Sequence, residues 1–341
     1  AIARADEAIT RLNSYPDVIA LEAVGPLLLR SEAIASSRIE GYELSQRNLA
    51  RALVDPRAAR GTARTVAANV VAMEESIAIA EKPAPLVVED LLEIHRTLMR
   101  EEPHARPGQL RTEQNWIGGR LSSPLDARYI PPPEWKVPGL VDDLVAFLNR
   151  EDLPPTAQAA VAHAQFETIH PFLDGNGRVG RCLIHVALRR GGVTPHFVPP
   201  VSIVLAARPG IYVDGLVAFR EGRLAEWCES FAAALERAAL LSDELASDVR
   251  RLQDEWYQRA GRPRRDSSAA RIINVLPAQP ITSAATIRAA IGARHQRALE
   301  GLRVLETAGV VRRVSESRWD QQFAADELFE LIERYEEAVS R

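Results

Sequence analysis

A glycine-rich turn at residues 170–181 joins two segments that both read as helices, and it constrains the fold more than any other part of the chain. His170 opens the turn with an imidazole that can take a proton near neutral pH. Asp174 supplies a carboxylate that can hold a hard cation such as Mg²⁺. Gly175-Asn176-Gly177 lets successive backbone N–H groups point at an anion, and the helix that follows places its N-terminus there.

Two arginines follow this turn. Arg178 and Arg181 lie three residues apart on a helix expected over 178–190, so they share a face and each offers a planar fork to phosphate oxygens. Each group also has an ordinary structural reading, as a packed histidine, a simple turn or a solvated arginine. A calcium loop built on Asp174 and Asn176 is disfavoured because no glutamate stands at the spacing that an EF-hand needs. The convergence of these groups in one short stretch favours a phosphate-transfer site.

The stretch resembles the signature of the Fic family, which reads His-x-Phe-x-(Asp/Glu)-Gly-Asn-Gly-Arg-x-x-Arg. Every fixed position is filled, by His170, Phe172, Asp174, Gly175, Asn176, Gly177, Arg178 and Arg181. The resemblance implies an all-α Fic-fold helical bundle with a short β-hairpin flap. It also implies transfer of AMP from ATP to a Tyr, Ser or Thr hydroxyl of a target protein, with pyrophosphate leaving.

Carried over position by position, the resemblance implies a role for each residue of the signature. His170 would be the base that deprotonates the target hydroxyl, and Phe172 would be an aromatic anchor in the core. The residues that would hold Mg·ATP are Asp174 for Mg²⁺, the Gly175–Gly177 backbone with Asn176 for the α-phosphate, and Arg178 and Arg181 for the β- and γ-phosphates. Tyr212 lies where the family places part of its adenine pocket.

Ser36, Glu40 and Gly41 fit a second pattern of the family, Ser/Thr-x-x-x-Glu-(Gly/Asn), which marks an inhibitory helix. On a helix, Ser36 and Glu40 lie on one face. The alternative is an exposed glutamate near a helix C-terminus, where the macrodipole mildly disfavours it. We interpret Glu40 as autoinhibitory. It would hold Arg181 in a bidentate pair, shielded by Ser36, and so keep the γ-phosphate of ATP away.

The chain has 341 residues, 46% of them hydrophobic, so it can bury a large core. We expect an N-terminal helical region over 1–85 that carries the inhibitory helix, a Fic core over 86–260, and a small unit over 267–341. Helices are expected over about 2–14, 27–41, 44–53, 62–81, 90–100, 137–149, 156–169, 178–190 and 224–257, and as a pair after Pro199-Pro200.

The net charge of −4 gives no global reason to expect nucleic acid or a membrane as partner. No apolar run is long enough to span a membrane and no signal peptide is recognisable, so a cytoplasmic location is expected. Cys182 and Cys228 stand in apolar helical contexts and read as buried, and His95, His163 and His185 read as packing residues.

Residues 107–133 are the least helical part of the chain, and 115–119 and 128–131 read as two short strands. In the Fic family a β-hairpin flap stands here and pairs with an extended segment of the target protein. The residues that the resemblance assigns to target binding are Trp116, Ile117 and Gly118. A purely structural hairpin is the alternative.

The segment after Ser267 resembles a winged helix-turn-helix unit, with helices over 269–276, 283–291 and 294–308 and wing strands at 309–314 and 318–319. Ten arginines stand against four acids from 264 to 318. Such a patch suits DNA, with Arg294, Arg297, Arg312 and Arg313 as expected phosphate contacts. A docking or dimer module is the alternative. Deleting this tail is expected to spare the labelling activity.

The main interpretation is therefore a protein adenylyltransferase that is held inactive by its own helix. Transfer of another phosphate group on the same fold, or removal of AMP with Glu40 orienting a water, stay open. A different class of function is a winged-helix DNA-binding regulator whose Fic core senses nucleotides. Self-modification and a homodimer are also left open.

Overall fold

Helices account for most of the residues that the computed structural model describes, namely 1–14, 24–118, 124–315 and 321–340. The α-helices are α1 (Ile2–Leu12), α3 (Gly25–Ile39), α4 (Gln46–Val54), α5 (Gly61–Ala80), α6 (Val88–Leu98), α7 (Val137–Leu148), α8 (Pro155–Ile169), α9 (Asn176–Arg190), α10 (Val201–Ala207), α11 (Pro209–Arg220), α12 (Leu224–Arg259), α13 (Ser268–Val275), α14 (Ala284–Ile291), α15 (His295–Thr307) and α16 (Asp326–Ser340). The strands are β1 (Ile281–Ser283), β2 (Arg312–Arg313) and β3 (Gln322–Ala324). The predicted all-α fold with a small C-terminal helix-turn-helix unit is confirmed.

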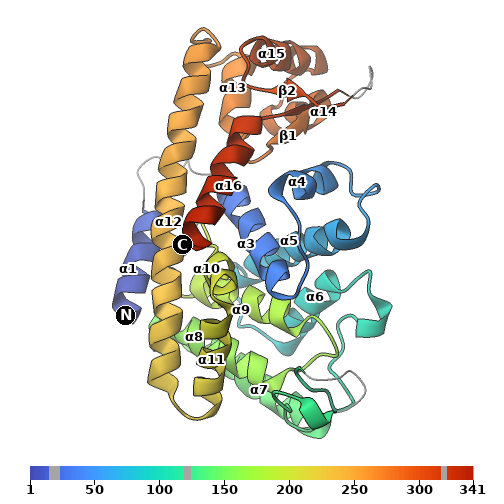
Figure 1. Cartoon of the computed structure of the whole chain (residues 1–341), viewed down its shortest axis with the longest axis vertical. Helices are drawn as coiled ribbons and strands as arrows, with labels where there is room; N and C mark the ends of the chain where they lie inside the picture. Colours follow the sequence, from blue (N-terminus) through green and yellow to red (C-terminus); the bar gives the residue numbers. More distant parts are fainter. Residues whose placement is uncertain (15–23, 119–123, 316–320, 341) are drawn as a thin grey trace.

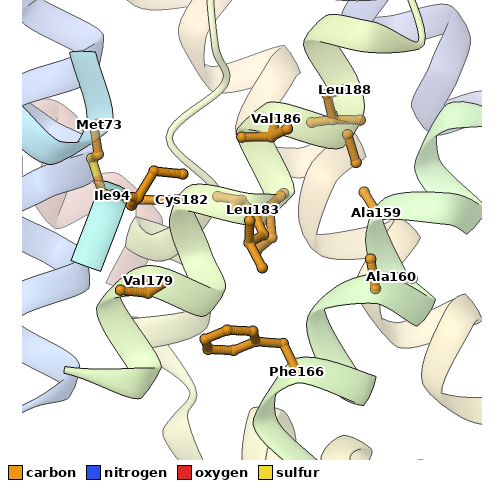
Figure 2. Packing of buried hydrophobic residues seen from close by; sticks show 14 of the residues in the cluster. Met73, Ile94, Ala159, Ala160, Phe166, Val179, Cys182, Leu183, Val186 and Leu188 are labelled. Atoms are coloured by element: carbon orange, nitrogen blue, oxygen red, sulfur yellow. The ribbon is translucent and has the colours of Figure 1, made fainter. Parts of the chain in front are cut away.

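Helix α9 lies in the middle of the main core, packed between α8 and α5 (Figure 2). Ala159 and Ala160 of α8 present only methyl groups towards it, so the two helices approach closely. Phe166 of α8 fills the space beneath Leu183 and is fully buried. Because α8 ends at Ile169 and α9 begins at Asn176, this packing fixes both ends of the turn that joins them.

Helix α12 runs along the length of the molecule, with α1 beside it (Figure 1). Asn13, just after α1, donates from Nδ2 to the carbonyl of Phe197 (3.1 Å) and accepts from the Phe197 N–H (2.8 Å). The first residues of the chain are thereby tied to the segment that precedes α10.

The C-terminal unit follows the order α13, β1, α14, α15, β2, β3, and its sheet has the strand order β1-β3-β2. Ile281 pairs with Ala324 and Arg313 pairs with Phe323, both antiparallel. The predicted strand at 318–319 lies outside the described residues, and the strand that pairs with β2 is β3, further along the chain. Neither β1 nor α16 was predicted.

A second buried cluster joins this unit to the rest of the chain. It contains Leu27 and Leu28 of α3, Leu241 and Leu245 of α12, and Trp256. Helix α16 returns from the sheet alongside α12 and contacts α4 and α10 (Figure 1). The N-terminal and C-terminal parts of the chain therefore share one core.

Cys182 and Cys228 are both buried and free, as predicted. Within the described residues no single helix is long and apolar enough to cross a membrane. Helices α10 and α11 meet that criterion of length and composition only as a pair, bent by 101°.

Candidate active site

The turn between α8 and α9 is held in an unusual backbone shape. His170 caps α8 with φ 49° and ψ 61°, a left-handed conformation that is uncommon for a residue other than glycine. Asn176 closes the turn, because its Oδ1 accepts from the Phe172 N–H (2.9 Å) and its Nδ2 donates to the Phe172 carbonyl (2.8 Å). Its amide is therefore engaged within the loop, and only its backbone N–H remains to face an anion.

Arg111 fastens this turn to the segment that precedes the flap. Its Nε donates to the His170 carbonyl (2.9 Å) and its Nη1 to the Glu113 carbonyl (3.1 Å), and its Nη2 donates to the Pro132 carbonyl. Asn115 adds a bond from Nδ2 to the Phe172 carbonyl (2.9 Å). Burial lowers the pKa of Arg111. Sequence reasoning missed both residues, because their partners are backbone carbonyls far along the chain.

His95 supports the other side of the turn. Its ring stacks on Phe172 with centroids 3.7 Å apart, its Nδ1 accepts from the Gly108 N–H (3.0 Å), and its Nε2 lies 3.1 Å from the Asp174 carbonyl. The ring is therefore protonated on Nε2. Burial lowers the pKa of His95 to about 4, so the ring is neutral. The predictions that His95 is a satisfied core histidine and that Phe172 is a buried anchor are confirmed.

The start of α9 offers a site for an anion. The N–H groups of its first turn have no intrahelical partners, as at the start of any α-helix. Its N-cap, Gly175, has φ 78° and no side chain that could bond to these groups, so they can bond to an anion. A Cβ atom added to Gly177 would lie 2.0 Å from Oε1 of Glu40. The absence of a side chain at Gly177 therefore leaves a cradle above the helix, and a carboxylate oxygen from the chain itself fills it.

Arg178 is buried beside this cradle without a carboxylate partner. Its guanidinium lies 3.6 Å from Met99 Sδ and 5.3 Å from the ring centre of Tyr42. The side chain is only 2% exposed, and its Nε and Nη1 have no hydrogen-bond partner within the described residues. A buried charge without a partner is costly, so this arginine is suited to an external anion.

Arg181 is held by the end of α3. Its Nε donates to Ser36 Oγ and its Nη2 to the Ser36 carbonyl, each at 2.8 Å. That carbonyl belongs to the last turn of α3, where helix carbonyls lack intrahelical donors and a cation is favoured. Burial acts to lower the pKa of Arg181, but Glu40 and other nearby acidic groups outweigh it and raise that pKa.

Glu40 reaches Arg181 because α3 ends at Ile39, which makes Glu40 the C-cap of the helix. Gly41 takes φ 84°, and the N–H groups of Gly41 and Tyr42 bond to the carbonyls of Arg38 and Ser37, a Schellman ending that leaves Glu40 as the C-cap. Glu40 Oε1 then lies 2.8 Å from Arg181 Nη2. The contact predicted from the sequence is present, but as a single hydrogen bond rather than a bidentate pair, because Nε bonds to Ser36 Oγ and Nη2 is shared between Glu40 and the Ser36 carbonyl.

Asp174 lies at the outer edge of the turn with its carboxylate 48% exposed. Its Oδ1 accepts from the Gly175 N–H (2.6 Å), and its Oδ2 lies 3.8 Å from Nε2 of His104. Among the residues that the structure describes, no group of three or more acidic, histidine or cysteine side chains is arranged to hold a metal ion. Asp174 would thus supply a single protein ligand, which fits Mg²⁺ held mainly by phosphate oxygens and water.

His170, at the start of the turn between α8 and α9, has a neutral imidazole ring. Burial is the largest influence on it and lowers its pKa to about 4; Glu40 acts to raise that pKa, whereas Arg111 and Arg220 act to lower it. The side chain keeps 18% of its surface exposed, while Nδ1 is buried and no hydrogen-bond partner for it lies among the described residues. A neutral ring with one accessible side can accept a proton at neutral pH.

Tyr212 lies behind Arg181 in the interior. It is 6% exposed, and its hydroxyl lies 2.8 Å from Nε2 of His163, whose Nδ1 lies 2.9 Å from the Gly180 carbonyl. The Tyr212 hydroxyl is therefore part of a buried hydrogen bond with His163. Adenine binding by Tyr212 stays a prediction. His163 packs as predicted, and burial lowers its pKa to about 3.

The flap is less regular than the sequence predicted. Its two strands reduce to one antiparallel bridge between Ile117 and Tyr129, and residues 119–123 lie outside the described part of the chain. Proline at positions 131–133 cannot donate the N–H groups that would extend the pairing. Tyr129 ties the bridge to the last turn of α8 through a bond from its hydroxyl to the Thr168 carbonyl (3.0 Å). Gly118 is exposed with φ 75°, and Trp116 and Ile117 are partly buried.

Two family models match the chain. The model described as "Fic/DOC family" covers residues 85–188, and the model described as "Fic/DOC family N-terminal" covers residues 1–78. Together they cover the turn, the flap and the helix that carries Glu40.

Curated relatives are similar over a shorter stretch. Protein adenylyltransferase Fic of Drosophila erecta is 34% identical over 117 residues, which are 33% of this chain and 22% of that protein. Protein adenylyltransferase fic-1 of Caenorhabditis elegans is 32% identical over 115 residues, or 33% of this chain and 21% of that protein. The similarity thus spans about a fifth of the length of these relatives.

Solved structures show the same fold. A Fic family protein from Desulfovibrio desulfuricans superposes with a TM-score of 0.58 at 23% identity, and the match covers 95% of both chains. Fic-1 from C. elegans superposes with a TM-score of 0.57 at 23% identity over 71% of this chain and 70% of that one.

Proposed function

This chain belongs to the Fic/DOC family, and from that premise we propose that it transfers AMP from ATP to a hydroxyl of a protein and is restrained by its own Glu40. One observation carries the proposal. The anion cradle over Gly177, beside two buried arginines, is filled by a carboxylate of the chain rather than being closed by packing. A site that binds an internal anion reversibly can bind a phosphate there instead.

The hydrogen-bond donors and the carboxylate around the turn fit Mg·ATP. Within the described part of the chain, Nε and Nη1 of Arg178 have no hydrogen-bond partner and no side chain caps the first turn of α9, and both features suit phosphate oxygens. Arg181 would hold the terminal phosphate once Glu40 releases it. Asp174 would hold Mg²⁺, which when bound would neutralise negative charge on the phosphates.

The transfer itself needs one proton acceptor. The neutral His170 takes the proton of the target hydroxyl while the hydroxyl oxygen forms a bond to the α-phosphorus. The bond from that phosphorus to the oxygen bridging to the β-phosphate breaks, and pyrophosphate leaves with the electron pair. The target would be placed by the flap, because Arg111, Asn115 and Tyr129 tie the flap region to the turn that carries His170.

Restraint follows from the same contacts. Glu40 Oε1 binds Nη2 of Arg181 and lies over Gly177, so it would keep a γ-phosphate from reaching the guanidinium there. ATP would then bind weakly, or with its α-phosphate out of line for attack. A cytoplasmic location, self-modification and a homodimer remain predictions.

The test is label transfer in lysate of the native host with two forms of ATP. Compared with lysate to which the chain is not added, ATP labelled at the α-phosphate should mark additional protein, and ATP labelled at the γ-phosphate should not. Transfer of the γ-label would instead indicate a phosphate-transferring enzyme, and loss of AMP from a pre-labelled target would indicate AMP removal. His170→Ala should lose about 10²–10⁴ in rate while retaining ATP binding, since a positioned base contributes that much. Equal labelling by this variant would contradict the mechanism.

A second candidate function is DNA binding by the C-terminal unit. Helix α15 lies at the end of the molecule away from the Fic core and follows α14 as the second helix of the unit's helix-turn-helix (Figure 1). The exposed arginines of α14 and of the α15 region that lack an ion pair within the described residues are Arg288, Arg294, Arg297 and Arg303. Arg312 and Arg313, also predicted as phosphate contacts, instead pair with Asp326 and Glu306.

This candidate is tested by the salt dependence of binding to duplex DNA. Arg294→Ala and Arg297→Ala should each weaken binding and reduce the slope of log affinity against log salt by about 1. Arg57→Ala, which removes an exposed arginine between α4 and α5, is the control for net charge. The candidate fails if no duplex shows salt-dependent binding, or if all three variants behave alike.

A further inference from the structure

Glu167 is a buried carboxylate that the proposed mechanism does not use. It lies on the last turn of α8, three residues before His170, and is 6% exposed. Its Oε2 lies 4.0 Å from Nδ1 of His170. Glu167 Oε1 and His170 Nδ1 are both buried without a hydrogen-bond partner within the described residues. The carboxylate oxygen nearest to Nδ1 is therefore Oε2, and a buried polar atom such as Nδ1 is costly when it has no hydrogen-bond partner.

The surrounding helices make room for this carboxylate. A Cβ atom added to Gly180 would lie 2.4 Å from Glu167 Oε1, so only glycine fits at that position of α9. Arg181 on the same helix, Arg220 on α11 and Glu40 at the end of α3 are the charged groups that act on it, and Tyr212 on α11 is the neighbouring titratable group. Burial is the largest influence and raises the pKa of Glu167 to about 7; Arg181 and Arg220 lower that pKa, and Glu40 raises it.

We propose that Glu167 is a positioning residue for His170: its carboxylate accepts a hydrogen bond from Nδ1–H, which leaves the lone pair on Nε2 to receive the target's proton. The separation of 4.0 Å is about 1 Å longer than a hydrogen bond, a gap that a small side-chain rotation closes. When Nε2 takes the proton, the ring becomes a cation, and a carboxylate on its far side stabilises it. This role rests on the proposed transfer reaction.

The main-chain carbonyl of Glu167 is the competing partner for the same ring nitrogen. It also acts on His170 and raises its pKa. A carbonyl would select the same tautomer, but it carries no charge and does not titrate. The two partners therefore differ in their response to pH and to loss of the side-chain charge.

The sign of the pH effect follows from the raised pKa of Glu167. Below about pH 7 the carboxyl is protonated and is a poor acceptor for Nδ1–H, and above that pH it is ionised. The transfer rate should therefore rise with pH through the neutral range. A change of Glu167 to glutamine should remove this rise.

The experiment uses the Glu40→Gly background, in which Arg181 no longer pairs with a carboxylate of residue 40. Glu167→Gln keeps the size of the side chain and the backbone carbonyl but removes the charge. We expect kcat to fall about tenfold or more, part of the roughly 10²–10⁴ that a general base contributes. KM for ATP should stay unchanged. The pH-dependent rise, which lies at lower pH in this background because Glu40 no longer raises the pKa of Glu167, should disappear. Glu229→Gln, an exposed change on α12, should alter neither quantity. Unchanged kcat and pH profile in Glu167→Gln would overturn the proposal.

A second measurement does not depend on activity or on the variant folding. The ring-nitrogen chemical shifts of His170 in the unsubstituted protein, followed by NMR, should show a step at the pH where Glu167 ionises. A titration without this step would overturn the proposal even if AMP transfer is confirmed. If the step is present but no AMP transfer occurs, the coupling stands and the proposed function fails.

Discussion

Gly177 links restraint and substrate binding in a single residue. The space where a side chain would begin holds Glu40 Oε1 at 2.0 Å from the ideal Cβ position, and Arg181 Nη1 lies 3.0 Å from it. An oxygen of ATP that binds at the start of α9 would need the same space. A methyl group at this position should therefore exclude both anions.

Gly177→Ala tests this geometry. In the Glu40→Gly background, the added methyl group should lower AMP transfer by about 10²-fold, since displacements of about 1 Å at a reacting centre cost that much. In the otherwise unsubstituted chain it should displace Glu40 without activating the enzyme. Gly139→Ala on α7, where an added Cβ meets nothing within 4 Å, is the matched control. Equal activity of Glu40→Gly with and without Gly177→Ala would show that the cradle does not hold a phosphate.

Sequence reasoning succeeded at this scale where a motif gives residue type and spacing together. The two motifs predict that Ser36, Glu40 and Arg181 are in contact, and the structure brings them together. Glu167 and Arg111 were missed. The significance of Glu167 depends on which polar atoms near His170 lack a hydrogen-bond partner, and that of Arg111 depends on which backbone carbonyls surround it. Spacing along the chain does not contain that information.

Helix α3 is tied to its neighbours by polar contacts well away from Glu40. Glu32 is fully buried and accepts from the Ser202 N–H (2.8 Å) and from Ser202 Oγ. Its Oε1 also lies 3.1 Å from Nε2 of His185 on α9. Asn69 of α5 adds a bond from Nδ2 to the Ala33 carbonyl (3.1 Å). These contacts fix the position of α3 against α9 and α10, and with it the position of its last turn.

Glu32→Gln should loosen this arrangement. The amide replaces one acceptor oxygen with a donor, so a buried donor on Ser202 or His185 loses its partner, which costs about 1–3 kcal/mol of unfolding free energy. AMP transfer should rise above that of the unsubstituted chain but remain below that of Glu40→Gly. Denaturant unfolding and label transfer check both parts, with Glu43→Gln at an exposed position as control. Lower stability without any gain in transfer would mean that Glu32 stabilises the fold but does not restrain the site.

The helices were predictable as elements, and β2 lies within the strand predicted over 309–314, whereas β1, β3 and the last helix were not predicted. The predicted helix over 156–169 is α8 (Pro155–Ile169), because its apolar pattern and the turn at His170 are local signals. β1 has three residues and exists because β3, about forty residues later, pairs with it. Pairing at such a distance leaves little trace in a short segment.

At the scale of the whole molecule, the C-terminal part bears directly on the inhibitory helix. Arg38 of α3 pairs with Glu336 of α16 (3.4 Å), and Gln46 of α4 donates to Glu336 Oε1 (2.9 Å). Leu27 and Leu28 of α3 belong to the buried cluster that includes the C-terminal unit. The sequence led us to expect that the tail could be removed without effect on the site, and these contacts argue against that expectation.

Deletion of residues 267–341 should therefore destabilise the chain. It would expose apolar side chains of α3 and α12, each worth about 1.5–3 kcal/mol when fully buried. We expect a lower Tm and altered AMP transfer, measured by calorimetry and label transfer. Arg38→Ala, which removes a single partly exposed ion pair, should change Tm by little and serves as control. A deletion variant with unchanged Tm and unchanged transfer would restore the view of an independent tail.

The most direct test of the whole account is the rate of AMP transfer by Glu40→Gly at saturating Mg·ATP, compared with the unsubstituted chain. Freeing Arg181 from a charged hydrogen bond worth about 1.5–3 kcal/mol should raise the rate about tenfold or more. Adding Arg181→Ala should cancel the gain, because the γ-phosphate then lacks its guanidinium. A Glu40→Gly variant that transfers AMP no faster than the unsubstituted chain would contradict the account.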